Sequence, residues 1–199
     1  MSSETRRLRL HSFAAGSEAN GPGVRAVVWL QGCTLGCLGC CNPHSLDADG
    51  GTWVSVAALA DRVLQAKGIE GVTVSGGEPL QQLPALVTFL RRIRRCSALS
   101  VVLFTGYTWR EVQKLDPGSE LTSLVDAVLA GRYDRRRRVA GGLLGSQNKQ
   151  LRVLSHRYTR EDFVGLPDLE ISVDARGCIT TTGSELLEIE GAYVPFQYD

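Results

Sequence analysis

The chain has 199 residues, of which 43% are hydrophobic and 22% are charged, and its formal net charge is +1. This composition is typical of one folded domain that is large enough to bury a core without disulfide or metal staples. The longest apolar runs are far shorter than the roughly 18 residues of a membrane helix, and the N-terminal segment MSSETRRLRL lacks the apolar stretch of a signal peptide. The balanced charge does not favour nucleic acid as a partner. We therefore expect a cytoplasmic protein without a membrane partner.

Short runs of β-branched residues alternate with segments of helical periodicity along most of the chain. The predicted strands are residues 25–31, 71–74, 100–104 and 124–129. The predicted helices are residues 55–67, residues 84–95 and a short helix that begins at residue 108. Beyond residue 151 the sequence becomes richer in strand-forming residues, and segments 169–173 and 178–182 flank a turn at residues 174–177 that predicts a hairpin.

Capping residues support the ends of these helices. Ser55 is an N-cap candidate and Gly68 stands in the stop position of the same helix. Thr108 and Glu111 match a capping box, and the helix that they begin should end before Pro117.

Strand and helix in alternation imply parallel strands with right-handed crossovers. We predict an α/β fold, a partial (β/α) barrel of parallel strands with a C-terminal β-rich extension. It would be a single domain, 1–199, with its core at about residues 8–150, and the hairpin would serve as a cover or edge for the barrel. An open doubly wound sheet is the other architecture that fits the pattern.

Four unusual segments each follow one predicted strand. They are the cysteine segment 33–40, SGGEP at 75–79, FTGY at 104–107 and AGRYD at 130–134. Because the carboxyl ends of parallel strands meet at one edge of a sheet, we expect these segments to form one site.

Cys33, Cys37 and Cys40 are spaced C-x3-C-x2-C in the segment QGCTLGCLGCCNP. Iron–sulfur clusters of the cubane type are normally held by four thiolates, so three from one loop leave one iron open to a small molecule. A zinc site is the alternative, with Cys41 or His44 as the fourth ligand, although structural zinc sites tend to take two ligands from a distant segment. A disulfide framework fits less well, because the chain has no secretory leader and Cys40 and Cys41 are neighbours.

The segment SGGEP suggests a binding turn. Gly76 and Gly77 have no side chain, which lets a ligand approach the backbone, and Glu78 places a carboxylate beside it. Such a turn suits a ligand with an ammonium and a carboxylate. An equally good explanation is a tight turn with Glu78 near a helix N-terminus.

The cysteine motif followed by Ser75-Gly76-Gly77-Glu78-Pro79 resembles the radical S-adenosylmethionine (SAM) superfamily. The segment GPGVRAVVWLQGCTLGCLGCCNP, the FTGY stretch and the later GRYD resemble the small activating enzymes of anaerobic ribonucleotide reductase and their single-cluster relatives. The similarity covers roughly residues 8–150.

The resemblance implies a 4Fe-4S cluster on Cys33, Cys37 and Cys40, with SAM chelating the open iron. The turn 75–78, comprising Ser75, Gly76, Gly77 and Glu78, would hold the SAM amino group. Gly39 would lie near the adenine, and Thr105 and Gly106 of FTGY are assigned to the same cofactor site. An electron from a flavodoxin or ferredoxin would then cleave SAM to methionine and a 5′-deoxyadenosyl radical.

The resemblance implies an activase, which passes the radical to a glycine of a partner enzyme. Two departures from the family pattern weaken this assignment: Cys41 replaces a common His or Tyr, and residues 144–149 only partly match the reductase activases. Modification of a peptide or small metabolite is therefore a second hypothesis. A third is a module that binds a cluster or zinc without catalysis.

Other noticeable residues are assigned no catalytic role. The arginine run 135–138 and the arginines at 91–95 are expected to be solvated, although the first run could dock an acidic partner. Cys41 is interpreted as a spectator, and Cys96 and Cys178 as buried structural residues. His11 and His156 are expected at the surface or in satisfied core positions. Tyr133 and Asp134 would either contact the ligands or belong to a loop that folds back.

Overall fold

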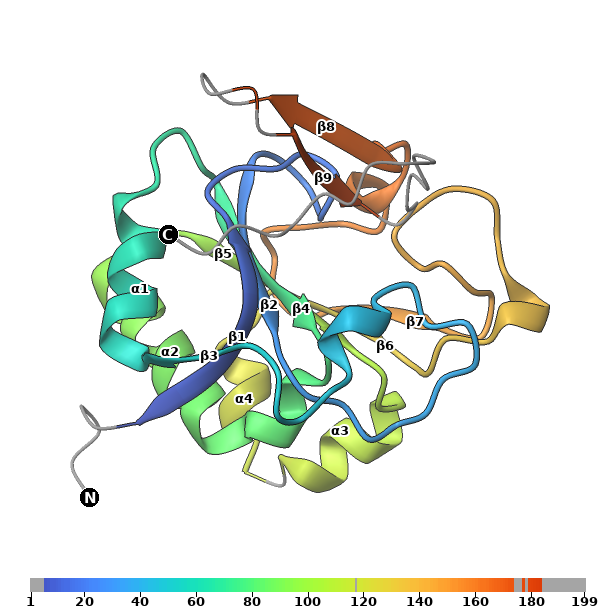
Figure 1. Cartoon of the computed structure of the whole chain (residues 1–199), viewed down its shortest axis with the longest axis horizontal. Coiled ribbons are helices and arrows are strands. Elements are labelled where there is room, and N and C mark those ends of the chain that lie inside the picture. The colour runs from blue at the N-terminus through green and yellow to red at the C-terminus, as the bar shows by residue number, and fades with distance from the viewer. Residues whose placement is uncertain (1–5, 117, 174–176, 178, 184–199) are drawn as a thin grey trace.

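The structure is a computed structural model that describes residues 6–116, 118–173, 177 and 179–183. Its centre is a seven-stranded sheet with the strand order β3-β1-β2-β4-β5-β6-β7 (Figure 1). The strands are β1 (Arg7–Ala14), β2 (Arg25–Leu30), β3 (Thr52–Ser55), β4 (Gly71–Gly76), β5 (Ser100–Thr105), β6 (Ala127–Ala130) and β7 (Gln150–Val153).

The four central strands β2, β4, β5 and β6 run parallel, as the alternating pattern predicts. At one side of the sheet β1 pairs antiparallel with both β2 and β3, and at the other side β7 pairs antiparallel with β6. The fold is therefore α/β with a largely parallel central sheet. The closure of this sheet into a partial barrel stays a prediction.

Strands β1, β3 and β7 are not among the predicted elements. The segment RLRLHSFA of β1 carries charges that suggest an exposed N-terminus, yet Leu8 and Leu10 are buried because they point to the core between outward arginines. Strands β3 and β7 have four residues each, too few for a clear period-two pattern.

Helices α1 (Val56–Gln65) and α2 (Leu83–Cys96) lie side by side on one face of the sheet (Figure 1). Ser55 caps α1, as predicted, by accepting a hydrogen bond from the Ala58 backbone N–H at 3.1 Å. The helix ends at Gln65, two residues before the predicted end, because Ala66 is already extended.

The remaining helices are α3 (Trp109–Leu115) and α4 (Glu120–Ser123). The predicted capping box of α3 is present: Glu111 N–H donates to Thr108 Oγ1 at 3.3 Å, and Thr108 N–H donates to Glu111 Oε2 at 2.7 Å. Pro117 lies outside the described residues. Leu124 is the C-cap of α4, so the prediction that a strand begins there is wrong, and β6 starts at Ala127.

Apolar side chains pack on both faces of the sheet. Toward α1 and α2, side chains such as Val101 and Leu103 join Phe89 and Leu90 in the larger core. On the opposite face, Val102 and Leu129 belong to a smaller core. Alternation along β5 thus places neighbouring residues in different cores, and both faces of the central strands are covered.

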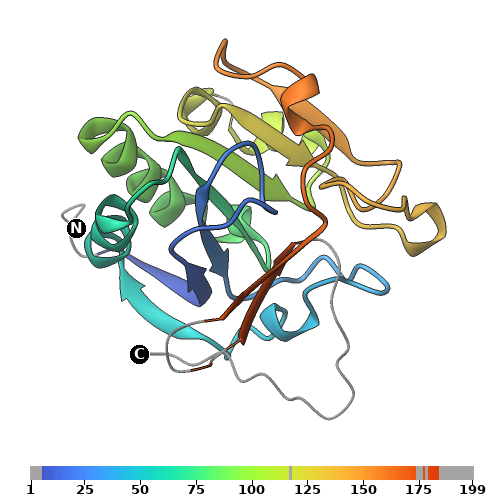
Figure 2. The same ribbon diagram turned by 90° about the horizontal axis from the view of Figure 1, so that it is seen from above.

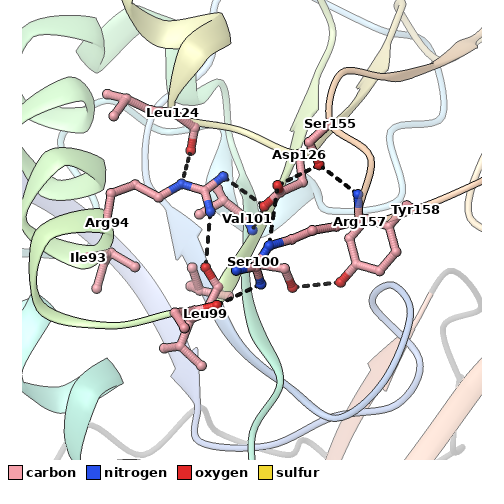
Figure 3. A network of polar contacts seen from close by, with 12 residues as sticks. Ile93, Arg94, Leu99, Ser100, Val101, Leu124, Asp126, Ser155, Arg157 and Tyr158 are labelled. Atoms are coloured by element: carbon pink, nitrogen blue, oxygen red, sulfur yellow. Dashed lines mark hydrogen bonds and ion pairs between the residues drawn. The ribbon is translucent and has the colours of Figure 1, made fainter.

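A polar network joins the amino-terminal ends of the parallel strands (Figure 3). Asp126, just before β6, accepts hydrogen bonds from Arg94 Nη2 of α2, from the Val101 backbone N–H and from Ser155 Oγ, each at 2.7 Å. Nearby, Tyr158 and Ser100 share a hydrogen bond of 2.6 Å, and both contact the fully buried Arg25 at 2.9 and 3.0 Å. This end of the sheet is therefore occupied by structural contacts.

The predicted hairpin is present as a separate two-stranded sheet, β8 (Leu169–Val173) and β9 (Ile179–Gly183). Residues 174–176 of its turn and Cys178 lie outside the described residues. Thr182 ties the hairpin to the segment after β1 through a 2.8 Å hydrogen bond with Ser17 Oγ. In the described part of the chain, no helix combines the length and the apolar character that crossing a membrane requires.

Candidate functional site

The loops that follow β2, β4, β5 and β6 surround a cavity of about 590 Å³ at the carboxyl edge of the sheet. Figure 2 shows the loop after β2 and the loop after β6 on the side of the sheet away from α1 and α2. The lining includes every residue that the sequence assigns to cofactors: Cys33, Cys37, Gly39, Cys40, Ser75, Gly76, Gly77, Glu78, Thr105 and Gly106. The volume lies in the range of about 300–1,000 Å³ that is usual for small-molecule sites.

The cysteine loop leaves β2 and is fixed at its start by backbone hydrogen bonds. Gly32 N–H donates to Ser45 O at 2.8 Å, and Cys33 N–H donates to Leu46 O at 3.0 Å. Glycines at 32, 36 and 39 all have positive φ, which allows the tight path between the cysteines. The loop is thus a folded unit whose three cysteines line the cavity.

Two of the sulfur atoms accept backbone hydrogen bonds. Leu35 N–H points to Cys33 Sγ at 3.5 Å, and Asn42 N–H points to Cys40 Sγ at 3.4 Å. Such N–H contacts stabilise thiolates and tune iron–sulfur clusters. Cysteine sulfurs with such contacts are therefore the type of ligand that an iron–sulfur cluster takes.

The thiols are not gathered as they would be around an ion. Within the described ranges, no three His, Cys, Asp or Glu side chains are close enough together to hold a single metal ion. Burial raises the pKa of Cys33, and a hydrogen bond between the Cys40 and Cys41 thiols raises the pKa of Cys40 and lowers that of Cys41 to about 6. Cys33, Cys37 and Cys40 thus share a cavity as free thiols.

The glycines of the SGGEP turn are required by the neighbouring backbone. A Cβ on Gly76, whose φ is +108°, would lie 2.2 Å from Leu30 N, and a Cβ on Gly77 would lie 2.3 Å from Gly32 O. The turn also donates to β2 and its loop, from Gly77 N–H to Leu30 O at 2.6 Å and from Glu78 N–H to Gly32 O at 2.9 Å. These residues therefore hold the SGGEP turn against the start of the cysteine loop.

Glu78 connects the ends of β4 and β5. Its side chain caps a short 3-10 helix, Pro79–Gln82, by accepting from Leu80 N–H at 2.9 Å. It also accepts from Thr105 Oγ1 at 2.7 Å and from Gly106 N–H at 2.8 Å. Only 1% of Glu78 is exposed, and this burial raises the pKa of its carboxyl group. The capping explanation of the sequence is confirmed, and Thr105 and Gly106 bind Glu78 at the cavity wall.

The loop between β6 and β7 forms a cationic wall that sequence reasoning did not place in the site. Arg135, Arg138 and Lys149 line the cavity, where Glu78 is the acidic residue among the described lining. Tyr133 lines it as well, whereas Asp134 caps a short 3-10 helix, Arg135–Arg137, through Arg136 N–H at 3.0 Å. The four successive arginines were a visible signal, but their position depends on how the loop folds back.

The hairpin also reaches the site. Residues 180–183 of β9 line the cavity, as do residues 11–14 of β1. His11 is buried with its Nδ1 2.8 Å from Gln31 Oε1, and burial lowers the pKa of the imidazole; His156 is exposed. Cys41 is exposed beside the ligand candidates.

The prediction that Cys96 is buried is wrong. The apolar stripe of α2 makes its last core contact at Ile93, and Cys96 is exposed at the end of the helix. The expectation for Cys178 lies outside the described residues.

Three relatives with known names are similar to this chain. A pyruvate formate-lyase-activating enzyme from Listeria monocytogenes is 32% identical over 126 residues, which cover 59% of this chain and 51% of the relative. A pyruvate formate-lyase 1-activating enzyme from Escherichia coli is 32% identical over 123 residues, or 59% of this chain and 50% of the relative. The anaerobic ribonucleoside-triphosphate reductase-activating protein of phage T4 is 31% identical over 140 residues, or 66% of this chain and 85% of the relative.

The chain spans about half the length of the two pyruvate formate-lyase-activating enzymes. Residues 19–152, which contain all the predicted cofactor residues, match the family described as "4Fe-4S single cluster domain". The resemblance to radical SAM activating enzymes is confirmed by this match and by the three relatives. The chain belongs to the 4Fe-4S single cluster domain family.

Proposed function

We propose that this chain is a radical SAM activase. Reductive cleavage of SAM at a 4Fe-4S cluster would give methionine and a 5′-deoxyadenosyl radical, which takes a hydrogen atom from a glycine of a partner enzyme such as anaerobic ribonucleotide reductase. The observation that carries this proposal is the shared cavity that brings the three cysteines and the turn 75–78 together. The relatives, whose names describe activating enzymes, support the same activity.

We propose Cys33, Cys37 and Cys40 as the cluster ligands. The backbone hydrogen bonds to two of their sulfurs support this role, because these contacts favour the thiolate form. A cubane cluster takes each thiolate on a different iron, so the three sulfurs need not meet at one point, and the glycines of the loop permit backbone adjustment. Cys41 is not needed as a ligand in this arrangement.

The turn 75–78 is proposed to hold the amino group of SAM. The N–H groups of Gly77 and Glu78 are already donated to carbonyls of β2 and its loop. The turn can therefore offer carbonyl oxygens to a ligand, and carbonyls accept from an ammonium. Ser75, Gly39, Thr105 and Gly106 would complete the SAM site, the last two by fixing Glu78.

Radical chemistry requires that water and competing hydrogen donors are kept away from the reacting atoms. The sheet edge, the loop 131–149 and the strand β9 contribute the walls of the cavity. We propose that the sheet forms a partial (β/α) barrel, and that the protein works in a cytoplasmic, reducing environment with a flavodoxin or ferredoxin as electron donor.

A different substrate is the second candidate. Residues 144–149, which depart from the reductase activases in sequence, include Leu144, Gly145 and Lys149 of the cavity wall. A cavity wall that differs from that of the reductase activases favours a different substrate. Modification of another polypeptide or a small metabolite is therefore the alternative to activation of the reductase.

The test is activation of candidate partners. Anaerobically reconstituted protein with SAM and a reductant is incubated with each glycyl radical enzyme encoded in the same genome, and electron paramagnetic resonance is recorded. We expect the doublet of a glycyl radical with one of them, together with one 5′-deoxyadenosine per radical. Formation of 5′-deoxyadenosine without a doublet from any partner would favour the alternative substrate.

A further inference from the structure

The two arginine clusters of the chain differ in their charge environment. On α2, three arginines are paired with carboxylates: Arg92 with Asp61 at 2.8 Å, Arg94 with Asp126 at 2.7 Å, and Arg91 with Glu120. In the run 135–138 all four residues are exposed, and an ion pair joins Arg137 Nε to Asp134 Oδ2 at 3.6 Å. Among the described residues, no carboxylate pairs with Arg135 or Arg136. Arg135 and Arg136 therefore keep their positive charge at the surface.

This run lies against the cysteine loop. A Cβ on Gly39 would be 3.1 Å from Cδ of Arg135, so the arginine stem packs directly on the residue that precedes Cys40. Beside this contact the outer surface of the cysteine loop is open, since Leu38 is 83% exposed and Cys41 is exposed. The positive charge is thus placed where the ligand loop itself reaches the surface.

The run is presented on a fixed turn. Asp134 Oδ1 accepts from Arg136 N–H at 3.0 Å, and Gln147 N–H donates to Arg137 O at 2.8 Å. A β-bridge joins Arg138 and Ser146 across the loop. Because the backbone is held at both ends, little conformational entropy is lost when a partner binds.

We propose that Arg135–Arg137, with Leu38 and Cys41 beside them, form the docking site of an acidic one-electron carrier protein that reduces the cluster. The inference rests on the proposed function. The reduced carrier loses one electron and the cluster gains it, and no bond forms or breaks. Electron-transfer encounters are small and transient, and complementary charge mainly raises their association rate, so a compact cationic patch beside the ligand loop suits them.

The outward arginines favour a carrier over the polypeptide substrate. A substrate must place its hydrogen donor inside the cavity, but Arg136 and Arg137 are not part of the cavity lining. A carrier needs only a surface close to the cluster ligands. The substrate polypeptide is therefore an outcome to be tested rather than the proposed occupant.

The experiment uses anaerobic stopped-flow mixing of the reconstituted protein with a reduced flavodoxin, which is the acidic probe. At low salt we expect the double variant R136Q/R137Q to react with a second-order rate constant about tenfold below wild type, because loss of interface charge acts on association. The difference should vanish near 0.5 M salt, where charges are screened beyond about 4 Å. The matched control R91Q/R95Q, which removes two charges from α2, should react as wild type does.

Reduction by the methyl viologen radical cation separates docking from damage to the cluster. Equal viologen rates and equal iron contents in wild type and R136Q/R137Q, with a slower flavodoxin reaction, support the proposal. If the double variant loses iron, the single variant R136Q is measured instead. If an intact variant reacts with flavodoxin at the wild-type rate, the docking proposal is overturned. If that variant, reduced by viologen, also fails to activate the partner enzyme, the arginine run is assigned to the substrate instead. Absence of SAM cleavage by reduced wild type would refute the proposed function, not the docking site.

Discussion

Gly76 and Glu78 belong to the same SGGEP turn, and a different physical cause fixes the position of each. Gly76 has positive φ and no room for a side chain beside Leu30. Glu78 is buried, and its carboxylate accepts hydrogen bonds from three donors. Both constraints bring the SGGEP turn into register with neighbouring strands. The proposed cofactor site is therefore built partly from residues that contact protein rather than ligand.

Replacing Gly76 by alanine should be far more harmful than the same change at Gly68. Strain at positive φ and overpacking each cost on the order of 1–3 kcal/mol, so we expect Gly76→Ala to lower the free energy of unfolding by about 2–6 kcal/mol. Gly68 also has positive φ, but a Cβ there would meet nothing within 4 Å. Its alanine variant should lose only about 1–2 kcal/mol. Urea unfolding of the two variants makes the comparison, and equal losses would contradict the steric argument.

The carboxyl group of Glu78 should affect stability in a pH-dependent way. Burial raises its pKa in the folded protein above the ordinary 4.5, so its contribution to stability is full below pH 4.5 and is lost as pH rises through the folded pKa. Glu78→Gln removes an acceptor and should cost about 1–3 kcal/mol. That cost should shrink between pH 4.5 and pH 8 in urea titrations. A cost that grows with pH would show that the hydrogen bonds outweigh burial.

At the scale of elements, Asp126 holds together three parts of the chain at the edge opposite the site. Its carboxylate joins α2 through Arg94, β5 through Val101 and the segment after β7 through Ser155 (Figure 3). Burial alone would raise the pKa of Asp126, but the hydrogen bonds from Ser155, Val101 and Arg94 outweigh it and hold the pKa below 3.8. This clamp fixes the strands whose other ends carry the cavity.

We expect Asp126→Asn to destabilise the protein by about 3–5 kcal/mol at neutral pH, because it leaves the partly buried Arg94 without its charge partner. The exposed pair Asp61 and Arg92 is the control, and Asp61→Asn should cost less than about 1 kcal/mol. The stability that Asp126 supplies is present above pH 3.8 and is lost as pH falls through its lower folded pKa. The difference in unfolding free energy between wild type and Asp126→Asn should therefore become smaller in acid. A loss for Asp126→Asn as small as that for Asp61→Asn would refute the clamp.

At the scale of the whole molecule, the sequence was sufficient for the parallel centre of the sheet and for the order of segments along its carboxyl edge. Alternating periodicity and helix caps such as Ser55 and Thr108 are local signals, and local signals are readable from one sequence. Strand β1 was missed because its arginines mask buried leucines, and β7 because four residues carry too little pattern.

The sequence predicted which residues line the shared cavity, but it did not predict the contacts that these residues make. Glycine spacing indicated a tight turn, yet it did not reveal that the space is filled by the backbone of Leu30 and Gly32. The arginine run was visible in the sequence, but its place in the cavity wall was not, because the positions of Arg135 and Lys149 depend on the folded path of a long loop. Long-range packing of this kind leaves no periodic signal in the chain.

Single serine variants of the cysteines should separate ligands from the spectator. Loss of outer-shell partners alone weakens metal sites about 10–100-fold, so Cys33→Ser, Cys37→Ser and Cys40→Ser should each hold at least about tenfold less iron after anaerobic reconstitution. Cys41→Ser should keep wild-type iron, sulfide and absorbance. If Cys41→Ser loses the metal as the others do, a four-cysteine site that includes zinc becomes the better explanation.

Binding of SAM through its amino group and carboxylate to one iron of a three-thiolate cluster is tested most directly by electron–nuclear double resonance. The reduced, reconstituted protein is measured with SAM that carries nitrogen-15 in the amino group and oxygen-17 in the carboxylate. We predict hyperfine coupling from both labels to the cluster spin, and loss of both couplings in the absence of labelled SAM. A reduced cluster whose spectrum shows neither coupling with SAM present in excess would contradict an open iron beside the turn 75–78.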